Sequence, residues 1–397
     1  MSKHTINSVQ KTQVTIKTSD DEWIFGEKSN VTLKGANAHG IFVGKGFDGN
    51  TLDFSGQVTV NGDMAADLFI LGNNNVVTVE AAAKFMGNDV GLATEGSGTV
   101  FNNLGSITAA KFGIFAVDPN VTITNSGEIS ASDVQGAGVV FGAGHLTNKS
   151  GGTIYGKLYG IDVAGNMHKT FVNKGTISSD GDAIYDNQGG HLAIKNQGTI
   201  DGDVWLGTGT GVIDTRTGTL HGTIHGSDGD TTFLISNANQ KIVEDSDHGT
   251  DTVKSTVSYT LGDNIENLVL LGKANVNATG NATDNHLTGN AGNNTISGGA
   301  GLDVLDGGKG NDVLTGGDDQ DNFVFDKGNG VDTITDFVHG SDYINILKFS
   351  QFTDFDGLSS HISQHHKDTW IDLGGGDKVI LHHFDSTTLT ADDFVFA

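Results

Sequence analysis

The apolar residues of this chain fall in short runs that are separated by polar segments rich in Gly, Asn and Asp. No stretch shows the helical period of about 3.6 residues, whereas many runs alternate apolar and polar residues as half-buried strands do. The runs recur at two regular spacings, a longer one in the first half of the chain and a shorter one near residue 300. This organisation predicts an all-β fold of stacked, repeating coils.

The longer period is marked by a motif of Asn, polar residues, Gly and Ile. Its asparagines are 22 to 25 residues apart, at Asn103, Asn125, Asn148, Asn173 and Asn196. Further apolar runs such as GIFAV, GVVF and GIDV lie between them. Short strands within such a period are typical of a right-handed parallel β-helix, here of about eight coils over residues 29–222. We expect each Asn to adopt a left-handed backbone at a bend and to hydrogen-bond along the stack through its amide.

The shorter period is nine residues, in GNAGNNTIS, GGAGLDVLD, GGKGNDVLT and GGDDQDNFV. Each unit has one apolar residue that it cannot bury alone, at Ile296, Leu305, Leu314 and Phe323. Stacking of the units would bury these residues in a common core. The spacing therefore predicts one turn and one short strand per unit.

The turns of these units have the composition of a metal site. Their glycines permit positive φ and close backbone approach, so that carbonyl oxygens can face an ion. The sixth position is a carboxylate in the three best units, at Asp303, Asp312 and Asp321. A hard cation prefers oxygen ligands of this kind.

The nonapeptides resemble the repeats-in-toxin family of haemolysin-type calcium-binding proteins, which form a parallel β-roll. The resemblance implies calcium as the bound ion. It implies metal-site residues in the turns at Asn294, Gly298, Gly299, Ala300, Gly301, Asp303, Gly307, Gly308, Lys309, Gly310, Asp312, Gly316, Asp318, Asp321 and Asp332. In the family, alternate repeats face the same flank. Because Asn285 and Asn294 stand where Asp is expected, we expect weak calcium binding or none at these two positions.

The formal net charge is −26, from 48 acidic and 22 basic residues. This surplus argues against nucleic acid and anionic membranes as partners. Acidic residues are concentrated around the nonapeptides, so we expect calcium binding to be coupled to folding there. The chain has no cysteine, which excludes disulfides and thiolate metal sites, and it has no run of eighteen apolar residues that would predict a transmembrane segment.

The start of the chain lacks the apolar core of a secretory signal. The tail, including GVDTITDF and the final LTADDFVFA, is similar to the C-terminal region of serralysin-like repeat proteins. This resemblance implies an uncleaved C-terminal signal, the type I secretion apparatus as a partner, and an extracellular or cell-surface location. The same residues can also cap the open end of the roll.

The expected organisation has three parts. A β-helix with an N-terminal cap covers residues 1–222, junction strands and the calcium roll cover residues 223–340, and the cap with the export signal covers residues 341–397.

A β-helix joined to a calcium roll is also similar to secreted alginate epimerases. Their catalytic motif is Tyr-Gly-x-Asp-Pro-His-Glu, and this chain matches it at Tyr159, Gly160 and Asp162 but not at the last three positions. His168, the next imidazole, would lie roughly 13 Å further along an extended strand. The matching segment is also a copy of the repeated apolar run, so a scaffold role explains it equally.

Other groups of candidate residues point less specifically to one chemistry. A lyase site that uses Tyr155, Lys157, Tyr159 and His191 stays open, because adjacent coils can bring such groups together. The pairs His365–His366 and His382–His383 offer imidazoles for a transition metal. We expect these cap histidines to be solvated, because neighbouring residues on a strand point to opposite faces.

These features favour a secreted, calcium-binding surface, adhesion or matrix protein that interacts with extracellular polysaccharide. The alternative is a polysaccharide lyase or a mannuronan C5-epimerase-like enzyme with its site on the β-helix. Fold alone does not decide between them.

Overall fold

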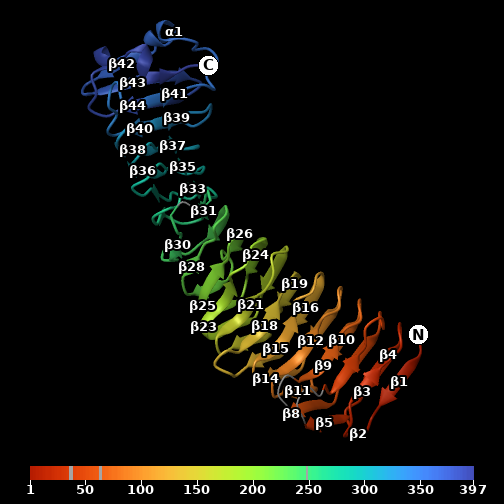
Figure 1. The fold of residues 1–397 in the computed structure, drawn as a ribbon. Helices are drawn as coiled ribbons and strands as arrows, with labels where there is room; N and C mark the ends of the chain where they lie inside the picture. Colours follow the sequence, from red (N-terminus) through yellow and green to blue (C-terminus); the bar gives the residue numbers. More distant parts are fainter. Residues whose placement is uncertain (35–38, 62–64, 247–248) are drawn as a thin grey trace. The chain divides into compact units, whose positions relative to one another are not determined.

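The computed structural model describes residues 1–34, 39–61, 65–246 and 249–397. The chain forms two compact units, Met1–Gly229 with Gln240–Ile242 and Asp230–Asn239 with Val243–Ala397. Each unit is a stack of coils whose equivalent strands pair in parallel (Figure 1). The predicted all-β fold, a parallel β-helix and a β-roll, is confirmed.

Most coils of the first unit contribute three strands. The first strands form one sheet: β1 (Lys3–Ile6), β4 (Glu22–Phe25), β7 (Thr51–Phe54), β10 (Val76–Val79), β13 (Val100–Asn103), β16 (Val121–Asn125), β19 (Gly144–Asn148), β22 (Lys169–Asn173), β24 (His191–Asn196) and β26 (Thr210–Asp214).

The second and third strands of the coils belong to another sheet. The second strands are β2 (Val9–Gln10), β5 (Asn30–Lys34), β8 (Gln57–Asn61), β11 (Lys84–Gly87), β14 (Ser106–Ala109), β17 (Glu128–Ala131), β20 (Thr153–Gly156) and β27 (Thr219–His221). The third strands are β3 (Val14–Ile16), β6 (Ile41–Val43), β9 (Ala66–Ile70), β12 (Val90–Thr94), β15 (Phe112–Ala116), β18 (Ala137–Phe141), β21 (Tyr159–Val163) and β28 (Ile224–His225). Two long strands, β23 (Thr176–Asp186) and β25 (Thr199–Leu206), run through both positions. The short strand β30 (Ile242–Val243) contains the last residue of this unit.

Alternation along the strands decides which side chains face the inside of the first unit. In β16, Val121, Ile123 and Asn125 are buried and the two threonines between them are half-buried. Equivalent residues stack from coil to coil, as Ile107 does on Ile129. The coils begin before the predicted start near residue 29, since β1 already pairs with β4 and β4 with β7.

The recurring asparagines form a ladder through the interior. Nδ2 of Asn103 donates to Oδ1 of Asn125 at 2.8 Å, and the same bond continues through Asn148 and Asn173 to Asn196 at 2.9 Å. These five residues are at most 2% exposed. The predicted amide stacking is confirmed. The predicted left-handed backbone is wrong, because none of the five has positive φ. Each ends a first strand with its side chain turned inward, where the ladder holds it.

The second unit has shorter coils with strands on two sides. One sheet contains β29 (Thr231–Ile235), β31 (Thr252–Ser255), β33 (Asn267–Leu270), β35 (His286–Thr288), β37 (Val304–Asp306), β39 (Asn322–Val324), β41 (Tyr343–Asn345) and β45 (Phe394–Val395). The other contains β32 (Tyr259–Thr260), β34 (Ala278–Thr279), β36 (Thr295–Ala300), β38 (Val313–Asp318), β40 (Val331–Ile334), β44 (Asp377–Leu381), β43 (Asp368–Gly374) and β42 (Ile362–His365).

The periodic apolar residues form the core of this unit. Ile296, Leu305, Leu314 and Phe323 are fully buried, as the nine-residue spacing predicts. Ile296 stacks beside Leu314, and Leu305 stacks beside Phe323. Each residue thus gains its burial from neighbouring coils.

The C-terminal segment departs from the parallel pattern. The strands β42, β43 and β44 pair antiparallel, and the short helix α1 (Phe355–Ser359) and two 3₁₀ turns (Ser386–Thr388 and Ala391–Asp393) flank them. Asp393 is fully buried and accepts hydrogen bonds from the N–H groups of Gly340 and Thr390. These bonds fix β45 against β41. No helix in the described ranges has the length and apolar character needed to span a membrane.

Candidate metal centre

Two nonapeptides make one 18-residue coil of the second unit. Val304 lies beside His286 and Asn322, and Leu314 lies beside Ile296. The sixth positions therefore stack along two flanks, as the family resemblance implies. One flank contains Asn285, Asp303 and Asp321, and the other contains Asn294, Asp312 and Asp332.

On each flank the carboxylates form a ladder with the backbone of the preceding coil. The N–H of Asn285 donates to Oδ1 of Asp303 at 2.8 Å, and the N–H of Asp303 donates to Oδ1 of Asp321 at 3.0 Å. On the other flank the N–H of Asp312 donates to Oδ1 of Asp332 at 2.9 Å. One oxygen of each carboxylate is thereby held in place.

The second oxygen of three carboxylates lacks a protein partner. Oδ2 of Asp303, of Asp312 and of Asp321 is buried and has no hydrogen bond within the described part of the chain. Each of these residues is only 1% exposed. A buried ionised oxygen without a partner is strongly destabilising. A hard cation on this oxygen would remove that cost, and a donor set of carboxylate and carbonyl oxygens fits calcium.

The electrostatics of the calcium-free turns agree with this geometry. Burial raises the pKa of Asp303 and of Asp312 to about 6, and the pKa of Asp321 and of Asp332 to about 7. Burial is the largest cause, and nearby carboxylates contribute to these values, among them Asp342 beside Asp321. Metal ligands must be deprotonated, so a cation at these carboxylates would compete with protons.

The backbone of these turns has a distinctive conformation. Their second and fourth residues have positive φ, namely Gly299 and Gly301, Gly308 and Gly310, and Gly317 and Asp319. Glycine adopts this conformation without steric cost, and Asp319 does so at 75°. The turns can therefore curl tightly, which is how backbone carbonyls approach an ion.

The first residue of each repeat must be small for a different reason. A methyl group on Gly298, Gly307 or Gly316 would overlap the carboxylate of the same repeat. The glycine thus leaves space directly beside the unpartnered oxygen. Ala300, also predicted for the site, ends β36 and is half-buried.

Asn285 and Asn294 are satisfied without an ion. Oδ1 of Asn285 accepts from the N–H of Asn281 at 2.7 Å, and its Nδ2 donates to the carbonyl of Ile265 at 3.0 Å. Asn294 makes the equivalent pair of bonds. In both turns the second and fourth residues lack positive φ. This arrangement supports the expectation of weak calcium binding or none at these positions.

Two other predicted residues have exposed side chains. The Lys309 side chain is exposed, and its ammonium group has no lone pair for a cation, so only its backbone carbonyl could serve. Asp318 is exposed at the end of β38, and it is not part of the carboxylate ladder.

The sequence prediction missed two carboxylates at the end of the flanks. Asp342 accepts from the N–H of Asp321 at 3.1 Å, and Asp336 accepts from the N–H groups of Gly316 and Gly317. The signal for Asp342 was present in GSDYI, which repeats the Gly-x-Asp-x-apolar core of the nonapeptide. This segment lies outside the nine-residue spacing, which is why it was missed.

The predicted catalytic residues are divided between two sheets. Tyr159 and Asp162 lie on β21, where the ring of Tyr159 stacks on Tyr185 at 4.5 Å. His168 directly precedes β22 in the other sheet and stacks on His191 at 4.8 Å. Among the residues proposed for a lyase site, Tyr155 and Lys157 both bind Asp180. His191 begins β24 in the other sheet, whereas Tyr155 and Tyr159 lie on β20 and β21.

An aromatic column crosses the coils of the first unit beside β21. The ring of Trp205 lies flat on His225 at 3.7 Å and meets Tyr185 edge-on at 6.4 Å. Nε1 of Trp205 donates to Oδ1 of Asp182 at 3.1 Å. The rings stack on one another, so they present their edges and polar atoms outward more than their flat faces.

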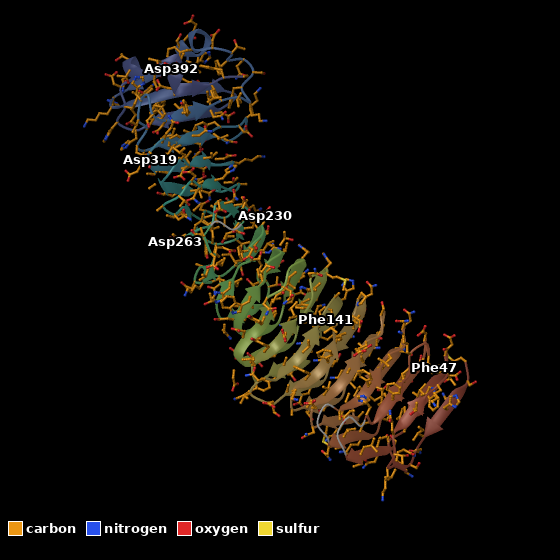
Figure 2. The ribbon with its side chains drawn as sticks, viewed as in Figure 1. Phe47, Phe141, Asp230, Asp263, Asp319 and Asp392 are labelled. Atoms are coloured by element: carbon orange, nitrogen blue, oxygen red, sulfur yellow. The ribbon has the colours of Figure 1, made fainter. Side chains whose placement is uncertain are left out.

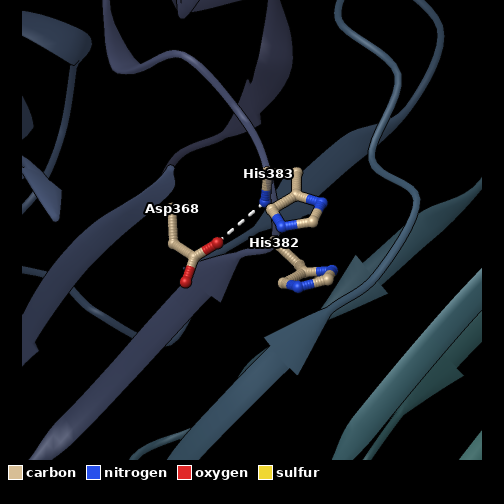
Figure 3. A group of neighbouring side chains, drawn as sticks. All are labelled: Asp368, His382 and His383. Atoms are coloured by element: carbon tan, nitrogen blue, oxygen red, sulfur yellow. Dashed lines mark hydrogen bonds between the residues drawn. The ribbon is translucent and has the colours of Figure 1, made fainter. Parts of the chain in front are cut away.

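One histidine pair of the C-terminal segment lies beside a carboxylate. Figure 3 shows Asp368, His382 and His383, whose ligand atoms lie within 4.8 Å of one another. Oδ1 of Asp368 accepts from the N–H of His383 at 2.9 Å. The two rings stack at 3.9 Å because His383 has a φ of 53°, which turns the chain out of β44. The prediction that adjacent histidines point to opposite faces is therefore wrong for this pair, although both rings are exposed.

Comparison with known proteins agrees with the geometry of the turns. Residues 279–314 and 298–332 match the family model of the RTX calcium-binding nonapeptide repeat. The chain is also similar to the endo-1,3-1,4-beta-glycanase EglC of Rhizobium meliloti (strain 1021), with 38% identity over 175 residues. That match covers 44% of this chain and 35% of the glycanase, so the chain spans about a third of the length of the glycanase.

Proposed function

Because residues 279–332 are RTX calcium-binding repeats, we propose that this chain is a secreted protein whose second unit folds when it meets calcium outside the cell. The observation that carries the proposal is the set of buried, unpartnered Oδ2 atoms of Asp303, Asp312 and Asp321. Without a cation these oxygens oppose the folded roll. With calcium they become part of its stabilisation.

By mass action, the stability of such a unit depends on the free calcium concentration of the compartment in which it lies. A site in free calcium at about 100 times its Kd stabilises the folded form by about 2.7 kcal/mol. Three sites of this kind would change the balance between an open and a folded roll. In a cytosol poor in calcium the acidic unit stays loose, which suits export of an unfolded chain through the type I secretion apparatus.

Folding can be tested on the full chain by hydrogen exchange with and without calcium. We expect strands β35 to β40 to gain strong protection in calcium, while β13 to β22 of the first unit change little. Equal protection of the roll in chelator would contradict calcium-coupled folding. Export can be tested separately in cells with a type I apparatus, where loss of residues 389–397 should retain the chain in the cell.

We further propose that the first unit interacts with an extracellular polysaccharide. The aromatic column with Tyr185, Trp205 and His225, flanked by Asp182, offers ring edges, an indole and carboxylates to sugar hydroxyls. The glycanase relative favours a β-glucan as the first polymer to test. Affinity electrophoresis in β-1,3-1,4-glucan and in alginate should show retardation that Trp205→Ala reduces. Equal mobility with and without polymer would contradict this part of the proposal.

A polysaccharide-degrading or epimerising enzyme is the second candidate, and the name of the glycanase relative is the observation that favours it. The separation of His168 from Tyr159 and Asp162 disfavours the epimerase version. Incubation with β-1,3-1,4-glucan and with uronate polymers in calcium separates the candidates. New reducing ends, unsaturated ends or C5 inversion would favour an enzyme, and intact polymer would favour a binding protein.

A further inference from the structure

A column of side chains in the second unit continues upstream of the matched repeats. The residues that directly precede strands β31, β33, β35, β37, β39 and β41 are in register from coil to coil. In order they are Asp251, Glu266, Asn285, Asp303, Asp321 and Asp342. The family match begins at residue 279, so Asp251 and Glu266 lie outside it.

These two upstream carboxylates make the same backbone bonds as the calcium-site carboxylates. The N–H of Thr231 donates to Oδ1 of Asp251 at 2.8 Å, and the N–H of Asp251 donates to Oε2 of Glu266 at 2.7 Å. In the repeats, the N–H of Asp303 donates to Asp321 in the same way. The ladder is therefore interrupted only around Asn285 and is present on both sides of it.

Asp251 also has the unpartnered oxygen that marks the calcium sites. Its Oδ2 is buried and has no hydrogen bond among the described residues. Asp251 as a whole is 0% exposed. The pKa of Asp251 is raised to about 7, mainly by burial and also by the carboxylates of Glu266 and Asp230. Asp230, which is labelled in Figure 2, lies one coil earlier. Its Oδ1 accepts from the N–H of Thr250. The charges of Glu266 and Asp230 thus both act on Asp251.

The backbone before Asp251 and Glu266 has the same left-handed residue as the carboxylate turns, and the asparagine turns lack it. The residue two positions before Asp251 is Gly249, with a φ of 74°, and the residue two positions before Glu266 is Asn264, with a φ of 60°. Asp319 has the same relation to Asp321, with a φ of 75°. The asparagine turns lack this feature, as described above. Gly249 to Val253 also reads Gly-x-Asp-x-Val, which is the core of the nonapeptide.

We propose that Asp251 and Glu266 hold a further calcium ion, upstream of the recognised repeats. The site opens onto a cleft that Gly249, Asn264 and Glu266 line together with Asp284. Two carboxylates supply hard oxygen ligands, and the carbonyls of a left-handed turn can supply others. The inference rests on the proposed calcium binding of the roll. It extends calcium control from the repeats to the coils that precede them.

The competing explanation is that Asp251 is simply protonated and binds no ion. Asparagine has the shape of a protonated aspartate, so the two explanations differ for Asp251→Asn. A protonated Asp251 predicts an unchanged number of bound calcium ions. A calcium ligand predicts the loss of one ion per chain.

The test is the number of calcium ions per full-length chain, measured by equilibrium dialysis at saturating calcium for the wild type and four variants. We expect Asp251→Asn and Glu266→Gln each to lose one ion. Asp321→Asn should also lose one ion, as a positive control within the repeats. Asp263→Asn, which removes an exposed carboxylate three residues from Glu266, should lose none (Figure 2). Circular dichroism in calcium verifies folding, and Glu266→Gln decides if Asp251→Asn does not fold.

The outcomes separate this inference from the proposed function. If the wild type binds no calcium, the proposed function fails. If Asp321→Asn loses an ion while Asp251→Asn and Glu266→Gln keep the wild-type number, only the upstream site is overturned.

Discussion

Nζ of Lys169 donates to Oδ2 of Asp186 across 3.1 Å inside the first unit, and the two side chains are 0% and 2% exposed. Lys169 begins β22 in one sheet and Asp186 ends β23 in the other, so the pair joins the two sheets within one coil. The ammonium also donates to the carbonyl of Gly189 at 3.2 Å, and Oδ1 of Asp186 accepts from the N–H of Gln188. A buried pair with this many bonds is costly to break from one side.

Removing one partner of this pair should therefore destabilise the first unit strongly. We expect Asp186→Ala to lower the free energy of unfolding by about 3–5 kcal/mol, because it leaves the Lys169 charge buried and unpaired. The matched control is Asp180→Ala, which removes the partner of Lys157 in a pair that is about half exposed on both sides and should change stability far less. Denaturant unfolding in saturating calcium measures both. Similar losses for the two variants would contradict a special role for the buried pair.

The asparagine ladder makes a second prediction about the first unit. Asn148 accepts from Asn125 and donates to Asn173 and to the carbonyl of Thr176, so Asn148→Ala interrupts the ladder at its centre. Unsatisfied buried amide groups cost about 1–3 kcal/mol each, and we expect a total loss of about 2–4 kcal/mol. Asn102→Ala, on the outward side of β13, is the control and should change stability little. The denaturant midpoint measures the change. A lower midpoint for Asn148→Ala than for Asn102→Ala would show that the ladder stabilises the unit, and equal midpoints would contradict this.

Much of this architecture was predictable because repetition exposes it. The period of the asparagines and the single apolar residue of each nonapeptide predicted the strands and their inward positions, and the family resemblance implied the two flanks of carboxylates. Positions that break the spacing were not predictable in the same way. Asp342 and Asp251 are in register with Asp303 in the structure, but irregular turn lengths hide them from a search for nine-residue units. Positive φ at residues such as Asn264, Asp319 and His383 is equally invisible, because the sequence signals this conformation reliably only where it is glycine.

The close approach of Gly316 to Asp321 gives a third prediction. Gly316 does not have positive φ, so alanine fits its backbone, but the added methyl group would overlap Oδ2 of Asp321. We expect Gly316→Ala to weaken calcium binding at that turn about tenfold or more, because the carboxylate must move away from its ligating position. Gly357→Ala in α1 has space for the methyl group and is the control. Calcium titration by calorimetry measures the change, and wild-type affinity in Gly316→Ala would show that this carboxylate does not bind the ion.

Without calcium, the folded roll should become less stable as the pH rises. A protein that is stabilised by ionised carboxylates shows the opposite pH dependence. The pKa of Asp303 and Asp312 is about 6 in the folded form and that of Asp321 and Asp332 is about 7, against an ordinary value of 3.8. A raised carboxyl pKa means that the folded form binds more protons than the unfolded form between these values. The stabilisation is complete below pH 3.8 and is lost as the pH rises through 6 to 7.

Calcium-free protein should therefore be more folded in its second unit at pH 5.5 than at pH 8, and calcium should restore folding at pH 8. Each titrating carboxyl changes stability by at most about 1.4 kcal/mol per pH unit, so several together give a clear transition. Hydrogen exchange of β35 to β40 in chelated buffer at both pH values measures it. Asp321→Asn should reduce the pH dependence because it removes one titrating group, while Asp318→Asn, at an exposed position, should leave it unchanged. Greater protection at pH 8 than at pH 5.5 without calcium would show that the buried carboxylates are accommodated as anions without an ion.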